Sequence, residues 1–204
     1  LLLGSVYIDT GEALSAEKEL RKAKSLGLSQ QQVMPLLGKS WLMLGQFDKV
    51  LAEVADDAAQ PAAVQALRGD ALLALGRKDE ARSLYARMLE GHPGQVEALL
   101  GLARIAALEQ QVAAAELLLA QALKAAPASL DALRLQGDLQ RLQGKDAAAR
   151  QTYLQILKLK PEHTQAHIEL ANLDIAQNRY ADAAAQLASA RRTTPNSLGV
   201  LQAQ

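Results

Sequence analysis

A 34-residue period runs through this chain and constrains its fold more than any other feature. In one register, the aromatic residues fall into three shared columns: Tyr7 with Trp41, Phe47 with Tyr180, and Tyr85 with Tyr153. Periods of roughly 20–50 residues are typical of arrays in which each unit buries its apolar face only by stacking on its neighbours. The sequence therefore predicts a repeat protein.

Two columns of the repeat contain mainly small side chains. With each repeat numbered from 1 to 34, column 8 holds Gly4, Gly38, Gly69, Ala103, Gly137 and Ala171. Column 20 holds Ala16, Val50, Ala81, Ala115, Ala149 and Ala183. Because small side chains let two helices approach closely, we interpret these columns as facing positions of an antiparallel helix pair. Larger residues in column 24 are expected to fill the space between pairs: Leu20, Val54, Tyr85, Leu119, Tyr153 and Leu187.

Other columns mark the helix ends. Column 15 holds Gly11, Gly45, Gly76, Gln110, Gly144 and Asn178, and glycine or asparagine there supplies the left-handed residue that terminates a helix. Column 32 holds Pro93, Pro127, Pro161 and Pro195, which close the second helix. These signals predict first helices at 31–44, 63–75, 96–109, 130–143 and 164–177. They predict second helices at 14–27, 47–58, 78–91, 112–125, 146–159 and 180–193.

The fold class that follows is all-α. We expect residues 1–204 to form a single solenoid of about six antiparallel helix pairs. The repeats cover approximately 1–30, 31–61, 62–95, 96–129, 130–163 and 164–197, with a partial repeat at 198–204. Both ends fall inside a first helix, so we expect the array to be truncated within a repeat at each end.

The repeat at 31–61 departs from this pattern. It is three residues short, so its second helix is expected to be clipped. Pro35 lies early in its first helix, where it either occupies the first turn or kinks the helix. Ser29 and Gln32 have capping-box spacing, which would start the helix before Pro35 and favours the kink.

Composition excludes several classes of function. The 22 basic and 22 acidic residues are interspersed and give no net charge, so no basic stripe is available for nucleic acid. No apolar run reaches membrane-spanning length, so no transmembrane segment is expected in this chain. The chain has no cysteine, so it can form no disulfide and has no thiolate for catalysis or metal binding. The absence of cysteine does not distinguish a cytosolic from a periplasmic protein.

Catalytic, cofactor and metal sites have little support in the sequence. His163 and His167 are four residues apart, a spacing that can place two imidazoles on one metal, but no cysteine or HExxH order accompanies them. Asp174 lies in column 11 as a buried acid, and we interpret it as a local distortion or a hydrogen-bonded group rather than a general base. We therefore predict no catalytic residue, no cofactor, no metal and no enzymatic activity.

Taken together, the columns resemble the tetratricopeptide repeat superfamily over essentially the whole chain. This resemblance implies that the all-α solenoid is a right-handed superhelix. A narrower resemblance rests on the stretch from Ala16 to Val54, which includes the segment VMPLLGKSWLMLGQFDKVL. This stretch is similar to the tetratricopeptide lipoproteins of the bacterial PEP-CTERM and exosortase system, which are linked to exopolysaccharide production. That resemblance implies a periplasmic protein, or one anchored to the membrane through a segment outside this chain; otherwise the protein would be cytoplasmic.

The superfamily binds extended peptides or partner proteins on the concave face formed by its first helices. Carried over to this sequence, the partner-binding residues are Lys39, Leu42, Asp70, Leu73, Arg104, Arg134, Asp138, Arg141 and Asn172. Two interpretations of the arginines stay open. They could present guanidinium groups to a carboxylate or an acidic sugar. Alternatively, Glu97, Asp131 and Asp138 neutralise them and leave an ordinary solvated surface.

The predicted function is a non-enzymatic scaffold that binds a protein or peptide segment in its groove. The predicted context is assembly or export of exopolysaccharide in the bacterial envelope, with a polysaccharide-export component as a candidate partner. One alternative is a general scaffold in an unrelated complex. The other is the docking or regulatory part of a larger enzyme.

Overall fold

The computed structural model describes residues 1–193, and this part of the chain consists of twelve α-helices without a β-strand. The first seven are α1 (Leu2–Asp9), α2 (Ala13–Ser25), α3 (Gln30–Met43), α4 (Phe47–Glu53), α5 (Ala62–Ala74), α6 (Lys78–Gly91) and α7 (Val96–Leu108). The other five are α8 (Val112–Ala125), α9 (Leu130–Leu142), α10 (Asp146–Leu159), α11 (Thr164–Ala176) and α12 (Tyr180–Thr193). Pro195 and the predicted partial repeat at 198–204 lie outside the described residues.

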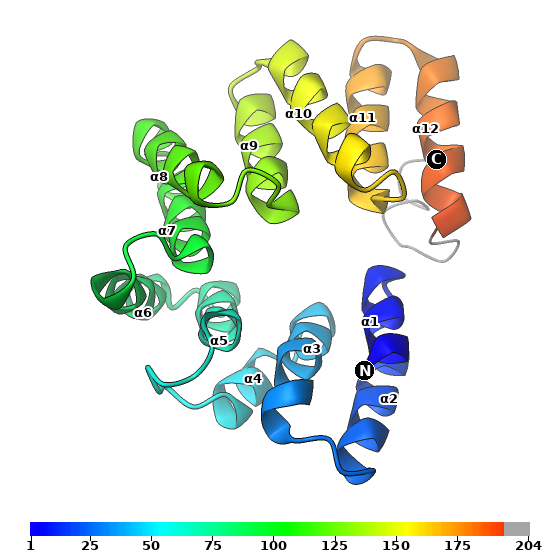
Figure 1. Cartoon of the computed structure of the whole chain (residues 1–204). Helices are drawn as coiled ribbons and strands as arrows, with labels where there is room; N and C mark the ends of the chain where they lie inside the picture. The colour runs from blue at the N-terminus through cyan, green and yellow to red at the C-terminus, as the bar shows by residue number, and fades with distance from the viewer. Residues whose placement is uncertain (194–204) are drawn as a thin grey trace. The chain divides into compact units, whose positions relative to one another are not determined.

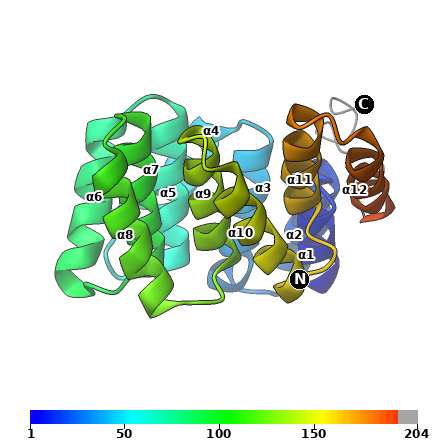
Figure 2. The same ribbon diagram turned by 90° about the horizontal axis from the view of Figure 1, so that it is seen from above.

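The helices form two compact units, Leu1–Gln111 with α1 to α7 and Val112–Gln204 with α8 to α12. Within each unit, helices that follow one another in the chain pack side by side, as α5 and α6 do in the first unit and α9 and α10 in the second (Figures 1 and 2). The predicted all-α solenoid of helix pairs is confirmed, and the predicted helix ranges agree with the observed ones to within a few residues, apart from α4. None of the helices in residues 1–193 combines the length and apolar character that crossing a bilayer requires.

The helix-end signals act as the sequence predicts. Every column 15 residue has a positive φ: Gly11, Gly45, Gly76, Gln110, Gly144 and Asn178. Helices α6, α8 and α10 each end two residues before a column 32 proline. The irregular repeat also has its expected form, because α4 has seven residues where α6 has fourteen. Ser29 and Gln32 make the predicted capping box, and Pro35 lies inside α3.

The small residues in column 8 make a contact that the sequence interpretation did not include. The atoms nearest to a Cβ added at Gly4, Gly69 or Gly137 belong to the column 24 side chain of the same repeat: Leu20, Tyr85 and Tyr153. In these three repeats the glycine therefore makes room for a large side chain one turn beyond column 20. At Gly38 the nearest atoms belong to Leu67 of the next repeat. That columns 8 and 20 face each other stays a prediction. The alanines of column 20 are buried, including Ala16, Ala81 and Ala149.

The aromatic columns contribute unequally to the core. Trp41, Tyr85 and Tyr153 are buried as predicted. Phe47 and Tyr7 are partly buried and pack against the core of the first unit. Tyr180 is 64% exposed, so its column does not require burial in every repeat.

Candidate functional site

The predicted binding residues all lie on the first helices of their repeats. Lys39 and Leu42 are on α3, Asp70 and Leu73 on α5, and Arg104 on α7, all within the first unit. Arg134, Asp138 and Arg141 are on α9 and Asn172 on α11, within the second unit. The charged members other than Lys39 take part in ion pairs inside each unit, as described below.

In the first unit, Asp70 joins three helices. Its Oδ1 accepts a hydrogen bond from the Tyr85 hydroxyl on α6 at 2.9 Å and one from Arg104 Nη1 on α7 at 2.6 Å. Arg104 occupies the same column as Asp70, one repeat later. Burial raises the pKa of Tyr85 far above its usual range, and the negative charge of Asp70 raises it further. Tyr85 therefore stays protonated and donates to Asp70.

The second unit repeats this motif with a different cation. Asp138 Oδ1 accepts from the Tyr153 hydroxyl at 2.9 Å, and Asp138 Oδ2 accepts from Arg134 Nη1 of the same helix at 3.0 Å. Burial, and then the charge of Asp138, raise the pKa of Tyr153. Asn172 stands in the column that Arg104 occupies in the first unit. Its amide is directed to Glu169, with Nδ2 to Oε2 at 3.4 Å.

Glu169 on α11 is a member of this surface that the sequence interpretation missed. Its Oε2 lies 3.6 Å from Arg141 Nε, its Oε1 accepts from Gln165 at 2.7 Å, and its side chain is only 12% exposed. The signal was present in the sequence: in column 6, Glu169 is the one charged residue in a column otherwise occupied by leucine or glycine.

These contacts bear on the two interpretations of the arginines. Asp138 pairs with Arg134, as expected if acidic residues neutralise the arginines. The other two arginines have partners outside the expected set: Arg104 pairs with Asp70, and Arg141 pairs with Glu169. Glu97 accepts from Gln95 instead, at 2.8 Å. The surface is therefore charge-balanced within each unit. Each guanidinium has five N–H donors and keeps several of them beyond the bonds described, so the surface can still donate to acceptors of a ligand.

The uncharged predicted residues and Lys39 have different environments. Leu42 and Leu73 are partly buried and pack against the cores of the first unit. Lys39 is exposed on α3. The partner-binding assignment of the nine residues remains a prediction.

The two histidines serve the start of α11. His163 Nδ1 accepts the backbone N–H of Ala166 at 3.2 Å and caps the helix, and burial, followed by the charge of Lys160, lowers its pKa. His167 Nδ1 lies 2.7 Å from Gln186 Oε1, and its Nε2 lies 2.9 Å from the carbonyl oxygen of Pro161. Within residues 1–193, no group of three acidic or histidine side chains is arranged to hold a metal ion.

Asp174 is the most deeply buried acid of the described chain. Its Oδ1 accepts from Arg150 on α10 at 2.6 Å and from Arg179 Nη2 at 2.7 Å. Two guanidinium groups on one buried carboxylate hold α10, α11 and the turn before α12 together. Of the two interpretations drawn from the sequence, a local distortion or a hydrogen-bonded acid, the structure shows the hydrogen-bonded acid.

Comparisons with known proteins agree with this geometry. Three sequence profiles described as tetratricopeptide repeat match residues 62–105, 110–164 and 140–204. No curated protein matches the chain.

Several solved structures share the fold. One is a thermophilic tetratricopeptide repeat protein from Thermus thermophilus, with a TM-score of 0.71 at 20% identity over 84% of this chain and 95% of that one. Another, from Parabacteroides merdae, has a TM-score of 0.61 at 17% identity over 97% of this chain and 79% of that one. MamA AMB-1 has a TM-score of 0.53 at 21% identity over 76% of this chain and 94% of that one. At these identities the likeness shows the fold alone.

Proposed function

Because this chain belongs to the tetratricopeptide repeat family, a family of protein-interaction scaffolds, we propose that its first helices bind an extended segment of a partner protein. The observation that carries the proposal is a charge-balanced cluster on the first helices of each unit: Asp70 and Arg104 in the first unit, and Arg134, Asp138, Arg141 and Glu169 in the second. An extended peptide presents N–H and C=O groups alternately. A surface of paired carboxylates and guanidinium groups offers acceptors and donors to both.

A peptide-binding experiment tests this proposal. Peptides selected from a random displayed library on the 204-residue chain are titrated against the variant Arg134→Glu/Arg141→Glu. We expect the affinity to fall about tenfold or more, because paired donors are replaced by acceptors beside existing carboxylates. The helical circular dichroism signal should stay nearly unchanged.

The matched control is Lys124→Glu/Lys158→Glu, which makes the same change in net charge. Both lysines are near the ends of second helices in the same unit, α8 and α10. Equal loss of binding in the two double variants would show that net charge alone is responsible. A large loss of helix in the arginine variant would show that Arg134 and Arg141 are structural, and the site assignment would be wrong.

We further propose that the scaffold works in exopolysaccharide assembly or export in the bacterial envelope. The resemblance of the stretch from Ala16 to Val54 to PEP-CTERM-system lipoproteins supports this context. Fractionation of cells that carry the full gene with a C-terminal epitope tag tests it. Recovery with the envelope, together with a polysaccharide-export component after cross-linking, is the expected result. Recovery in the cytosol contradicts the proposal.

A further inference from the structure

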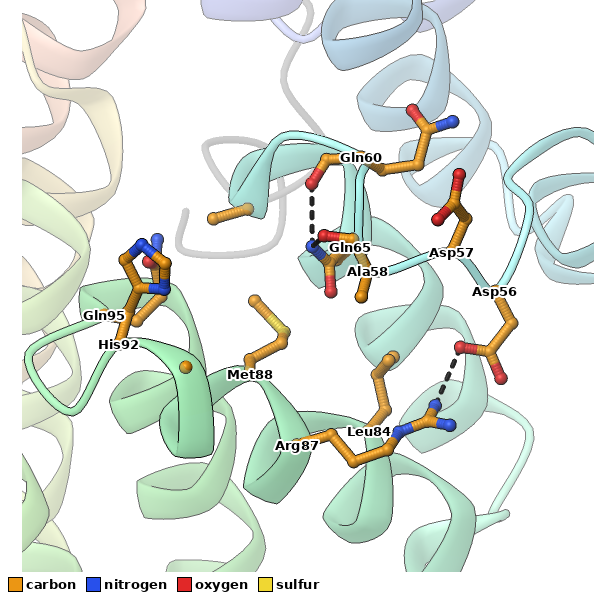
Figure 3. Close-up of a pocket in the computed structure, with 12 residues that line it drawn as sticks. Asp56, Asp57, Ala58, Gln60, Gln65, Leu84, Arg87, Met88, His92 and Gln95 are labelled. Atoms are coloured by element: carbon orange, nitrogen blue, oxygen red, sulfur yellow. Dashed lines mark hydrogen bonds and ion pairs between the residues drawn. The ribbon is translucent and has the colours of Figure 1, made fainter.

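The shortened helix α4 leaves a pocket in the first unit (Figure 3). Helix α6 continues to Gly91, but α4 stops at Glu53, so the residues that would form its last two turns become a loop leading to Pro61. The pocket between this loop and the C-terminal half of α6 has a volume of about 550 Å³. That volume lies within the range of about 300–1,000 Å³ that small-ligand sites occupy.

The loop that walls the pocket is fixed by side chains of α5. Arg68 Nη1 donates to the carbonyl oxygens of Leu51 and Val54, both at 2.8 Å, and so caps the shortened helix. Gln65 Nε2 donates to the carbonyl oxygens of Gln60 at 2.7 Å and Ala58 at 3.2 Å. Arg68 stands in column 7, which holds leucine in four of the six repeats. The sequence thus places a capping arginine in the repeat whose second helix is short.

Two aspartates complete this wall. Asp57 Oδ1 accepts the backbone N–H of Ala59 at 2.9 Å, which shapes the turn. Asp56 Oδ1 lies 2.7 Å from Arg87 Nη2 and joins the loop to α6. Since the charge of Arg87 is balanced by Asp56, the carboxylate of Asp57 gives the lining a net negative charge.

The floor of the pocket is apolar. Leu84 and Met88 are both largely buried, and Met88 points into the space between Ala58 on one side and His92 on the other (Figure 3). The pocket therefore has an apolar floor and, at its edge, the carboxylate of Asp57, for which the lining provides no cationic partner. This combination matches the side chains of lysine and arginine, which bury an aliphatic stem while keeping the charged end in water.

We propose that this pocket receives a lysine or arginine side chain of a partner peptide. The stem lies on Leu84 and Met88, and the charged end pairs with Asp57. This inference rests on the proposed function for the claim that the occupant is part of a peptide. It adds a site whose lining includes neither Asp70 nor Arg104, and it specifies the chemistry of the partner.

Methionine methyl NMR provides a local readout. The chain has three methionines, and Met34, in the core, and Met43, exposed on α3, serve as internal references for Met88. The probes are the N-acetyl methylamides of lysine, arginine, glutamate and leucine. We expect a saturable shift of the Met88 signal with lysine and arginine, at about millimolar affinity, and no comparable shift of the other two methionines. Asp57→Asn should weaken this binding about threefold to fivefold.

Two glycine variants test whether the probes occupy the pocket itself, because one of them fills the pocket with a side chain and the other does not. No atom lies within 4 Å of a Cβ added at Gly91, which lines the pocket, or at Gly94, which does not. Gly91→Leu fills the pocket and favours the helical conformation of α6, so it should abolish the Met88 response without loss of stability. Gly94→Leu adds the same side chain outside the pocket and should retain the response.

The outcomes separate this proposal from the general one. A Met88 signal that ignores the basic probes, responds equally to glutamate or leucine, or still responds in Gly91→Leu overturns the pocket proposal. If library-selected peptides bind Gly91→Leu with unchanged affinity, the pocket proposal fails and the scaffold stands. If no peptide binds while the basic probes still shift Met88, the scaffold proposal fails and the pocket remains a site for basic side chains.

Discussion

Tyr85 fixes the packing of two successive repeats through its contacts with two glycines. Its ring lies against Gly69 of its own repeat and Gly101 of the next, and a Cβ at either glycine would overlap with ring atoms. We expect Gly101→Ala to lower the free energy of unfolding by about 1–3 kcal/mol, because a buried aromatic ring has no space into which to move. Urea denaturation measures the change. Gly91→Ala is the control, since its Cβ meets open space; equal destabilisation by both variants would refute the packing argument.

Gln110 occupies a column 15 position, where the backbone conformation favours glycine. Its φ is 59°, in the left-handed region, where four of the other five column 15 residues are glycine. We expect Gln110→Gly to raise the free energy of unfolding by about 0.5–1 kcal/mol. A glutamine is strained in the left-handed conformation and a glycine is not, and removing this strain outweighs the larger conformational entropy that glycine gives the unfolded chain. The control Gln111→Gly, one residue later, should destabilise. A gain of stability in that control, or none in Gln110→Gly, would contradict this explanation.

Glu17 makes the stability of the first unit depend on pH. Its Oε1 accepts from Lys49 at 2.5 Å, Trp41 Nε1 at 2.9 Å and Arg21 at 2.9 Å. Burial alone would raise the pKa of Glu17, but these hydrogen bonds outweigh burial and lower the pKa from 4.5 to about 2. Because the folded-state pKa is the lower one, the carboxylate stabilises the fold above about pH 4.5, and that stabilisation is lost as the pH falls toward 2.

Glu17→Gln should therefore lower the free energy of unfolding by about 1–2 kcal/mol at pH 7, a value reduced for solvent screening. The difference from the unmodified chain should shrink between pH 4.5 and 2. Urea denaturation of both chains across this range measures it, with Glu53→Gln on the exposed end of α4 as the control. A difference that stays constant with pH would mean that Glu17 acts through packing rather than charge.

At the scale of the element, α4 shows how one side chain compensates for a missing half-helix. Arg68 donates to the carbonyl oxygens of Leu51 and Val54, which have no intrahelical donor at the end of α4. We expect Arg68→Leu to lower the free energy of unfolding by about 1–2 kcal/mol, although leucine is the usual residue of this column. Gln136→Leu is the matched control in the same column and should be neutral or stabilising. An equal change of stability in both variants would contradict the capping role of Arg68.

The elements were predictable from the sequence because their ends carry local signals. The glycine of column 15 and the proline of column 32 act on the backbone of their own neighbourhood, so helices such as α6 and α10 could be placed to within a few residues. The contact between columns 8 and 24 was not predicted. A column pattern indicates which side of a helix faces its neighbour, but not how far a long side chain such as Tyr85 reaches along that neighbour to Gly69.

At the scale of the whole molecule, the surface composition was more predictable than its ion pairs. The pattern placed Asp70, Arg104, Arg134 and Arg141 on first helices, where they are found. The partner of Arg141, by contrast, is Glu169 on another helix, and the partner of Arg104 is one repeat away. Such pairs depend on the distance between helices and on side-chain rotamers, which a repeat pattern does not determine.

The described helices make their extensive contacts with helices one or two places away in the chain order. Stability in such an array is a sum over neighbouring interfaces. Tyr153→Ala should therefore lower the free energy of amide opening by about 3–5 kcal/mol in α9, α10 and α11, because a fully buried ring is lost, while α2 and α3 keep their protection. Tyr85→Ala should give the reverse pattern, with losses in α5, α6 and α7. Hydrogen exchange with mass spectrometry measures both variants, and a uniform loss of protection in either would mean that the chain unfolds as one cooperative body.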